Sequence, residues 1–328
     1  MSALADDAAH ANARAWLRQY DVGEVLRIWP VSHGIENQNY FVQTQGLDRT
    51  RNFVLTILLG ESYAGDAYVP MMRHLDEQGL PVAGPLENRQ GEPISTDQDG
   101  ACMLQPRLIG QHTVNPTLKQ IESLARFVAR MHLASASSDF TLPDYPRNQA
   151  WLVAQGASLS AALPYADRQL MADSLRQTAS LLGREDVRAL PRGLIHGDLF
   201  RDNVLFNEHG LTGVLDFHHA ATGYFIYDLA VVTNDWCSDA SGLLDPDRAT
   251  RLLRAYHAIR PLSETETWFF SQFAAYAALA FWISRAAKVQ SERKAGNQRL
   301  KDPDEFKRIL QHLHKHYFYL DYRVLNAG

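Results

Sequence analysis

The chain has 328 residues, of which 46% are hydrophobic and 21% charged, so it is long enough to bury a large core and to form two lobes. Its formal net charge of −5 gives no electrostatic reason to bind a polyanion, and we expect no nucleic acid partner. The two cysteines, Cys102 and Cys237, are far apart in sequence, which excludes a disulfide framework or a cysteine-based metal site. We expect both to be small buried hydrophobes.

The first third of the chain is predicted to form a small antiparallel sheet with two helices. A short helix is expected over residues 5–20. Segments rich in β-branched and aromatic residues, separated by turn formers, predict strands, and one segment closed by a glycine predicts a helix that either starts at Pro70 or bends there. The strands are Val25–Ser32, Asn39–Gln45, Asn52–Leu58, Val82–Leu86 and Ala101–Gln105, and the helix is Gly65–Gly79.

After Pro106 the pattern becomes mostly helical. Apolar residues recur at helical spacing in five segments: Thr117–Ser135, Pro164–Gly183, Pro246–Ile259, Glu264–Val289 and Asp302–Tyr317. The pattern predicts an α+β fold with two lobes. Residues 1–106 would form a small antiparallel-sheet N-lobe that binds nucleotide, and residues 107–328 a larger helical C-lobe with the catalytic and substrate-binding residues.

No membrane segment is expected. The most apolar stretch, Trp268–Ser284, is near the length of a membrane span, but it contains Ser271, Gln272 and Tyr276, and Arg285 follows it. It is better explained as a buried helix. The acidic, amphipathic N-terminus does not have the pattern of a secretory signal, so a cytoplasmic protein is expected.

The segment HGDLFRDNVLF, from His196 to Phe206, carries the clearest chemical signal. Asn203 follows Asp198 by five positions and Asp216 follows Asn203 by thirteen. The spacing of the first two matches the catalytic loop H-R-D-L-x-x-x-N of protein kinases, with Gly197 where those kinases have arginine. Asp198 would accept the proton of an attacking hydroxyl, while Asn203 and Asp216 would bind Mg²⁺. The segment predicts an ATP-dependent small-molecule kinase.

A β-hairpin would bring the two predicted metal ligands together. Val204–Phe206 and Gly213–Phe217 are short apolar segments joined by the turn sequence NEHG. Pairing of these segments would set Asn203 and Asp216 side by side, which explains how ligands thirteen residues apart bind one ion.

Two other interpretations of this segment remain. Its acidic residues could cap helices on a surface loop, although the full set of residues at this spacing favours a catalytic site. Alternatively, His196, Asp198, His218 and His219 could ligate zinc or iron in a hydrolase. Adjacent histidines on a strand point in opposite directions, which disfavours joint ligation. We expect His196 to orient the loop through backbone hydrogen bonds, and His132 to be a core histidine with its hydrogen bonds satisfied.

The motif HGDLFRDN with its downstream DF resembles the aminoglycoside phosphotransferase/choline kinase superfamily. Further segments resemble the homoserine kinases of that superfamily, over most of the chain: Ser32–Val42, Asn52–Ile57, Gly79–Leu86, Tyr227–Cys237, Phe281–Lys288 and Lys301–Leu310. The resemblance implies a protein-kinase-like fold, ATP and Mg²⁺ as cofactors, Asp198 as the catalytic base, and Asn203 and Asp216 as metal ligands.

The resemblance also implies where the nucleotide binds. Met103, Leu104 and Gln105 would touch adenine, and the loop that would cover the phosphates consists of Gly34, Ile35, Glu36, Asn37, Gln38 and Asn39. This loop has a single glycine, so its backbone is less free to cradle phosphates than G-x-G-x-x-G. In addition, Thr56 stands where kinases carry a phosphate-binding lysine. Arg51 or another cation is a hypothetical replacement.

The implied acceptor is the side-chain hydroxyl of L-homoserine, phosphorylated on the way to threonine. A zwitterion needs a cation for its carboxylate and an acid for its ammonium group. Arg285 is the candidate cation and Asp235 the candidate acid, although a snorkelling arginine and a polar cluster at the core edge would explain them equally well. Arg201 and Asp202, beside Asp198, would assist.

Two other functions stay open. The first is a kinase of the same fold for another amino alcohol, choline or an aminoglycoside. The second is a nucleotide-binding protein with little catalysis, which Thr56 suggests. The expected partners are ATP and a small hydroxylated amino acid, and both a monomer and a homodimer are compatible with the sequence.

Overall fold

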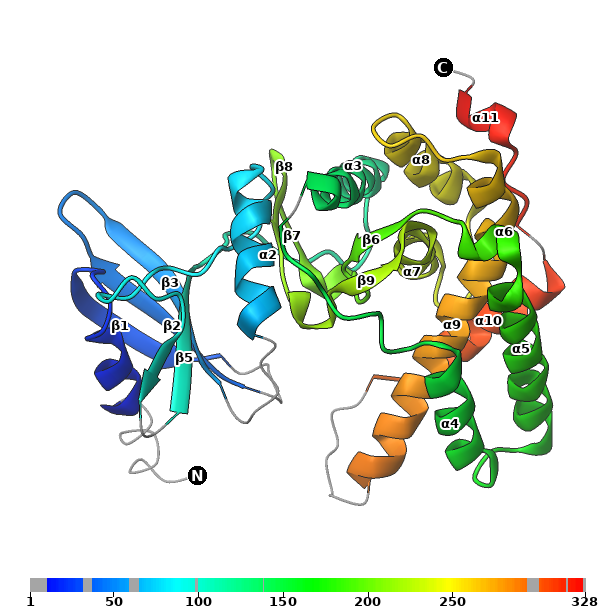
Figure 1. The fold of residues 1–328 in the computed structure, drawn as a ribbon, viewed down its shortest axis with the longest axis horizontal. Coiled ribbons are helices and arrows are strands. Elements are labelled where there is room, and N and C mark those ends of the chain that lie inside the picture. The colour runs from blue at the N-terminus through cyan, green and yellow to red at the C-terminus, as the bar shows by residue number, and fades with distance from the viewer. Residues whose placement is uncertain are drawn as a thin grey trace. The chain divides into compact units, whose positions relative to one another are not determined.

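The computed structural model describes residues 11–31, 37–58, 65–97, 100–137, 139–293, 301–316 and 318–326. The chain forms two compact units (Figure 1). Unit 1 comprises Met1–Gly110, Ser138–Thr141 and Thr212–Leu215, and unit 2 comprises Gln111–Ser137, Leu142–Leu211 and Asp216–Gly328. The two are described separately below.

Unit 1 is built on an antiparallel five-stranded sheet with the order β1-β2-β3-β5-β4. Its strands are β1 (Glu24–Pro30), β2 (Gln38–Gln45), β3 (Thr50–Leu58), β4 (Ser95–Asp97) and β5 (Gly100–Pro106). Buried and less buried residues alternate along β2, as expected for a strand with one face on a core. The antiparallel N-terminal sheet predicted from the sequence is confirmed.

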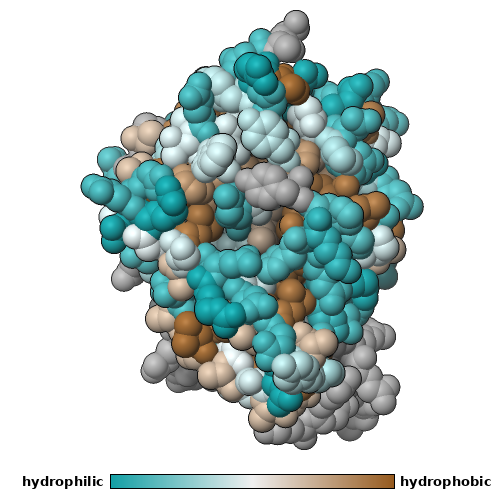
Figure 2. Space-filling view, turned by 90° about the vertical axis from the view of Figure 1, so that its right-hand side faces the viewer, coloured by the Kyte–Doolittle hydropathy of each residue, from teal (hydrophilic) through white to brown (hydrophobic). Residues whose placement is uncertain are grey.

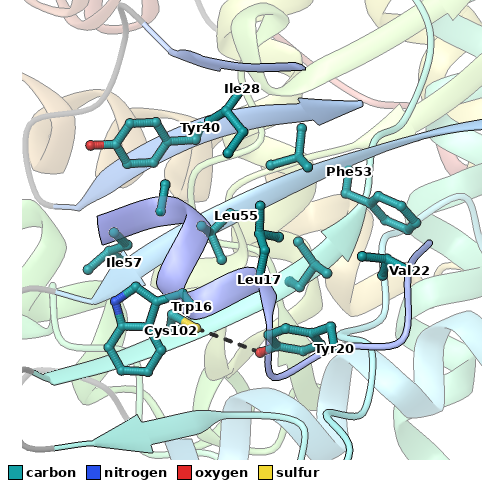
Figure 3. Packing of buried hydrophobic residues seen from close by; sticks show 13 residues of the cluster. Trp16, Leu17, Tyr20, Val22, Ile28, Tyr40, Phe53, Leu55, Ile57 and Cys102 are labelled. Carbon is teal, nitrogen blue, oxygen red and sulfur yellow. Dashed lines mark hydrogen bonds between the residues drawn. The ribbon is translucent and has the colours of Figure 1, made fainter. Parts of the chain in front are cut away.

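The core of unit 1 lies where the helix at residues 11–17 packs on this sheet (Figure 3). Trp16 and Leu17 from the helix meet Leu55 from β3, and all three are at most 3% exposed. The Tyr20 hydroxyl lies 3.8 Å from the Sγ of Cys102. Cys102 and Cys237 are both buried and free, as the sequence predicted.

The strand predicted at Val82–Leu86 was wrong. This segment has no regular structure, although the Leu86 N–H donates to the Leu104 carbonyl (2.8 Å) and the Gln105 side chain donates to the Ala83 carbonyl (2.6 Å). Pro85 interrupts it and offers no N–H to a ladder. The helix expected nearby is α2 (Gly65–Glu77), which begins five residues before Pro70 and contains it.

Unit 2 is mainly helical (Figure 1). Its helices are α3 (Leu118–Ala134), α4 (Gln149–Ser160), α5 (Tyr165–Gly183), α6 (Glu185–Arg188), α7 (Phe225–Cys237), α8 (Pro246–His257), α9 (Glu264–Arg293), α10 (Asp304–Lys315) and α11 (Tyr322–Asn326). The five helices predicted for this region are present. The start of α3 is fixed by a capping box, in which the Thr117 hydroxyl and the Gln120 side chain each bond to the other residue's backbone N–H.

Four further helices, α4, α6, α7 and α11, were not predicted. All thirteen residues of α7 are buried, including its polar ones, so it has no apolar stripe facing a polar one.

Helix α9 contains the apolar segment that was considered as a membrane span, and its residues from Phe269 to Ile283 are largely buried. Among the described residues, no helix combines the length and hydropathy of a membrane span. On the face of unit 2 seen in Figure 2, hydrophobic residues form separate patches between hydrophilic ones.

Two short β-structures position the motif. Strands β6 (Arg192–Ile195) and β9 (Ala221–Tyr224) pair antiparallel, and β6 leads directly into the loop that begins at His196. Strands β7 (Val204–Asn207) and β8 (Gly210–Val214) form a hairpin, as predicted, but the second strand lies earlier than the predicted Gly213–Phe217 and ends at Val214. Its turn is closed by the Asn207 side chain, which accepts from the His209 N–H at 2.8 Å.

Candidate active site

The site is built around the loop from His196 to Asn203, which ends in a 3₁₀ turn at Arg201–Asn203. The side-chain Nδ2 of Asn203 donates to the backbone carbonyl of Asp198 (2.8 Å) and lies 3.4 Å from its carboxylate Oδ2. These contacts fix the Asn203 amide and leave its Oδ1 without a hydrogen bond among the described residues. Asp198 itself is half-buried. The loop therefore presents one carboxylate and one free amide oxygen.

Asp216 follows the hairpin in a strained backbone conformation. Its φ of 61° and ψ of 59° lie in the left-handed region, and it is the only non-glycine among the described residues with positive φ. Such strain in an L-residue is common at functional sites. Asn203 precedes β7 and Asp216 lies two residues beyond β8, so both stand at the end of the hairpin opposite its turn.

Helix α7 holds the start of the loop through Asp228. Its Oδ2 accepts from the His196 N–H and its Oδ1 from the Gly197 N–H, both at 2.9 Å. The Nε2 of His132 lies 3.2 Å from Oδ2 as well. Burial acts to raise the pKa of Asp228, but these hydrogen bonds and the two nearby histidines outweigh it and hold the pKa below its ordinary value. Asp228 is therefore an ionised acceptor inside the fold.

The same helix holds the rest of the loop through Asp235 and Trp236. Asp235 lies seven residues, or about two turns, beyond Asp228 and accepts from the Arg201 N–H at 2.8 Å. The Trp236 indole donates to the Leu199 carbonyl at 3.2 Å. Sequence reasoning missed Asp228, although an acid seven positions before Asp235 in an apolar segment was a usable signal.

Gly197 is required by this arrangement. Its φ is +74°, and a Cβ there would lie 2.7 Å from the Tyr145 ring. Its carbonyl accepts from the Tyr145 hydroxyl at 3.1 Å, and that hydroxyl also lies 3.2 Å from the hydroxyl of Tyr227. These contacts explain why glycine stands where protein kinases have arginine. Tyr145 and Tyr227 therefore also belong to the site, although no motif in the sequence assigned a role to either.

The two histidines behave as the sequence predicted. His196 is fully buried, packs on the Phe217 ring (centroids 4.6 Å apart) and accepts from the Asp198 N–H at 3.3 Å through Nδ1. His132 is a core residue whose ring contacts Asp228 on one side and the Tyr256 hydroxyl (2.7 Å) on the other. Among the described residues, no three His, Cys, Asp or Glu side chains converge as a metal site.

The predicted acceptor residues have ion-pair partners. The Arg201 guanidinium bonds both oxygens of Asp235 at 3.2 Å, and burial raises the pKa of Asp235 despite this pairing. Arg285 donates to Glu305 at 2.5 Å, and Glu305 also lies 3.7 Å from Arg201. The structure thus joins Arg201, Asp235 and Arg285 in one network through Glu305. The fourth predicted residue, Asp202, is exposed and pairs with Lys301.

The predicted nucleotide residues belong to unit 1. Gly34, Ile35 and Glu36 lie outside the described residues, whereas Asn37 precedes β2 and Gln38 and Asn39 begin it. Met103 and Leu104 are buried within β5, with half-buried Gln105 beside them.

Where kinases have a phosphate-binding lysine, this structure has the uncharged, hydrogen-bonded side chains of Thr56 and Asn39. The Thr56 hydroxyl on β3 donates to the Asn39 side chain on β2 at 2.7 Å. Arg51, the hypothetical replacement for the missing lysine, stands five residues earlier on the same strand, about 17 Å away. It therefore does not lie beside Thr56.

Structural neighbours show the fold. An amicoumacin kinase, solved with AMP-PNP and Ca²⁺, superposes with a TM-score of 0.68 at 15% identity, covering 96% of each chain. A choline/ethanolamine kinase family protein from Mesorhizobium loti gives a TM-score of 0.66 at 14% identity, covering 97% of this chain and 99% of its own. The predicted two-lobed, protein-kinase-like fold class is confirmed.

Proteins found by sequence comparison are more similar to this chain than these structural neighbours are. The homoserine kinase of Cupriavidus pinatubonensis is 37% identical over 92% of this chain and 93% of its own length. That of Pseudomonas aeruginosa (strain UCBPP-PA14) is 36% identical over 89% of this chain and 90% of its own. Residues 27–262 match the profile of the phosphotransferase enzyme family. With that match across most of its length, the chain belongs to the phosphotransferase enzyme family.

Proposed function

We propose that the protein transfers the γ-phosphoryl group of ATP to the side-chain hydroxyl of L-homoserine, giving O-phospho-L-homoserine and ADP on the route to threonine. One observation carries the proposal: Asp198 and Asn203 share a hydrogen-bonded loop held by α7, in a chain whose relatives over about nine-tenths of its length are homoserine kinases. The family match supports the reaction class.

Asp198 is proposed to orient the acceptor hydroxyl and take its proton. The hydroxyl oxygen forms a bond to the γ-phosphorus while the bond from that phosphorus to the β,γ-bridging oxygen breaks, and ADP leaves. Asn203 bonds the Asp198 backbone at 2.8 Å, so the carboxylate is held in place before substrate arrives. Positioned general bases of this kind contribute about 10²–10⁴-fold to rate.

Asn203 and Asp216 are proposed to hold Mg²⁺. Both offer the oxygen donors that this ion prefers, and the Asn203 Nδ2 is already used within the loop, which leaves Oδ1 for a metal. The strained backbone of Asp216 supports a functional role for its carboxylate. When bound, Mg²⁺ would neutralise charge on the nucleotide phosphates.

In unit 1 we propose that residues 34–39 cover the phosphates and that Met103, Leu104 and Gln105 contact adenine. The Thr56–Asn39 pair would offer hydrogen bonding without a charge, so the charge compensation must come mainly from the metal. The choice of nucleotide is supported by the amicoumacin kinase of the same fold, which was solved with the ATP analogue AMP-PNP.

Arg201, Asp235 and Arg285 are proposed to shape the acceptor site through their ion-pair network with Glu305, assisted by Asp202, which pairs with Lys301. The expected partners are small molecules, with no nucleic acid or membrane, in a cytoplasmic monomer or homodimer. The use of ATP supports the cytoplasm as its location.

An acceptor panel tests the proposal. Purified protein with Mg·ATP is assayed against L-homoserine, L-serine, choline and kanamycin, and products are identified by ³¹P NMR. We expect L-homoserine to give O-phospho-L-homoserine with a kcat/KM about 10⁴ M⁻¹s⁻¹ or higher, and to exceed the other acceptors at least tenfold. Preferential turnover of choline or kanamycin, or ATP binding without transfer to any acceptor, would contradict it.

A further inference from the structure

Arg147 lies against the catalytic loop and takes no part in the proposed phosphoryl transfer. It follows a segment anchored on β9, where the Tyr145 N–H donates to the Thr222 carbonyl at 3.0 Å. Its Nη1 donates to the Tyr145 hydroxyl at 2.8 Å and lies 3.4 Å from the carbonyl of Gly197, the residue before Asp198. The guanidinium carbon stands 4.7 Å from the centre of the Phe281 ring.

No carboxylate in the described part of the chain pairs with this guanidinium. Three other arginines of unit 2 that are buried or half-buried have such a partner: Arg201 pairs with Asp235, Arg260 with Glu266 and Arg285 with Glu305. Among the described residues, Arg147 forms no ion pair within 4.0 Å. Burial opposes its charged form, yet the pKa of Arg147 is raised because Tyr145, Tyr227 and the Asp198 carboxylate favour the cation. It remains charged and lacks an anion in direct contact.

One edge of the guanidinium is open. Only Nη1 of Arg147 donates a hydrogen bond among the described residues, so Nε and Nη2 are free. Arg147 is half-buried, so part of the residue remains exposed to solvent. The Nε–Nη2 edge of an arginine is one of the two forks that match a carboxylate with two parallel hydrogen bonds.

We propose that Arg147 binds the α-carboxylate of the acceptor and so makes the enzyme select amino acids over amino alcohols. The inference rests on the proposed function, because it concerns the acceptor of that reaction. L-Homoserine carries its carboxylate and its hydroxyl at opposite ends of a short chain, and Arg147 stands beside the loop that presents Asp198. The Tyr145 hydroxyl accepts from Nη1 and the Phe281 ring packs against the guanidinium, which leaves the Nε–Nη2 edge for the ligand.

Arg285 is the rival for this role. It lies on the same aromatic cluster, since its guanidinium is 4.5 Å from the Phe306 ring and that ring is 5.3 Å from Phe281. Glu305 already occupies Arg285 at 2.5 Å, so a substrate carboxylate would have to displace it. A carboxylate reaching Arg147 displaces only solvent, which costs less free energy.

The test compares two acceptors on the same protein samples. L-Homoserine carries the carboxylate, and 3-aminopropan-1-ol keeps the amine and the hydroxyl without it. Arg147→Ala, Arg147→Lys and Arg285→Ala are measured beside the wild type, with Arg192→Ala as control. Arg192 is exposed and pairs with Asp144, so its loss removes an arginine from this region without removing a contact to the loop. The ratio of the two kcat/KM values cancels any inactive fraction of protein.

We expect Arg147→Ala to lower kcat/KM for L-homoserine roughly 30-fold to 1,000-fold, mainly through KM, with less than a threefold change for 3-aminopropan-1-ol. Lysine should restore part of the loss, and Arg192→Ala should behave as wild type. Equal losses on both acceptors would assign Arg147 to positioning the loop and overturn the inference, as would a loss of carboxylate preference in Arg285→Ala alone. Failure of the wild type to phosphorylate L-homoserine would instead overturn the proposed function.

Discussion

At the scale of single residues, two backbone conformations decide the geometry of the site. Gly197 and Asp216 both have positive φ, one at each end of the motif. Asp198, Asn203 and Asp216 could be proposed from the sequence because their spacing is typical of a phosphoryl-transfer site. Arg147 was not, because its role depends on folding a segment without regular structure onto the loop, fifty positions away.

Gly197→Ala should damage the loop. An alanine there would adopt a left-handed conformation, which costs about 1–2 kcal/mol, and its Cβ would lie 2.7 Å from the Tyr145 ring. We expect a loss of at least 2 kcal/mol or so in unfolding free energy by urea titration, together with at least a tenfold or so lower kcat. Gly183→Ala is the control, since nothing lies within 4 Å of a Cβ there. Equal stability of the two variants would refute this account of Gly197.

At the scale of elements, α7 is the support on which the catalytic loop rests. Asp228, Asp235 and Trp236 bond the backbone of the loop at four residues: His196, Gly197, Leu199 and Arg201. The sequence did not predict α7 because a helix buried on every side shows no helical alternation of polar and apolar residues. By contrast, α3 was predicted nearly to the residue, since its capping box and apolar stripe are both local.

Asp228→Asn should destabilise the protein and slow turnover. Both carboxylate oxygens of Asp228 accept a backbone N–H, so an amide must turn its NH₂ toward one of these donors. The expected cost is about 2–4 kcal/mol, with kcat reduced more than the KM for ATP increases. Asp247→Asn, an exposed acid at the start of α8, is the control. Unchanged melting temperature and kcat in Asp228→Asn would disprove this support role.

The buried contact of His132 on α3 with Asp228 on α7 and Tyr256 on α8 should make the free energy of unfolding fall in mild acid. Burial lowers the pKa of His132, opposed by Asp228, so the folded protein takes up this proton less readily than the unfolded chain. The stabilisation is complete above the ordinary pKa of 6.5 and is lost as pH falls below it, by at most about 1.4 kcal/mol per pH unit.

This pH dependence is measured by urea unfolding between pH 7.5 and 5. His132→Asn should flatten the profile over this window, whereas His209→Asn, which removes an exposed histidine, should leave it unchanged. Asp228 contributes only at lower pH, because its pKa is already below the ordinary value of 3.8. Identical slopes for wild type and His132→Asn would contradict the assignment.

At the scale of the whole molecule, the sequence was sufficient for the class of fold. Alternating strands followed by long amphipathic helices predicted a sheet unit and a helical unit, because these patterns are local and repeated. The partner of each predicted acceptor residue was not predictable. Arg285 and Glu305 are twenty positions apart on α9 and α10, and their pairing depends on how those helices pack.

Nucleotide should stabilise the protein only when the metal ligands are intact. At about 100 times its Kd, Mg·ATP should add roughly 2.7 kcal/mol, which raises Tm by about 4 °C in a protein of this size. Scanning calorimetry with Mg·ATP, ATP plus EDTA and no nucleotide measures the effect. Asp216→Asn should lose most of the magnesium-dependent part while keeping the Tm of the free protein. A full magnesium effect in that variant would remove Asp216 from the metal site.

The central claim is that Asp198 activates the acceptor hydroxyl. Single-turnover transfer from γ-³²P-labelled ATP to L-homoserine, with ATP affinity measured in parallel, tests it on wild type and Asp198→Asn. We predict a rate lower by about 10²–10⁴-fold, with the Kd for Mg·ATP changed less than threefold or so. Transfer at a rate near that of the wild type would contradict it.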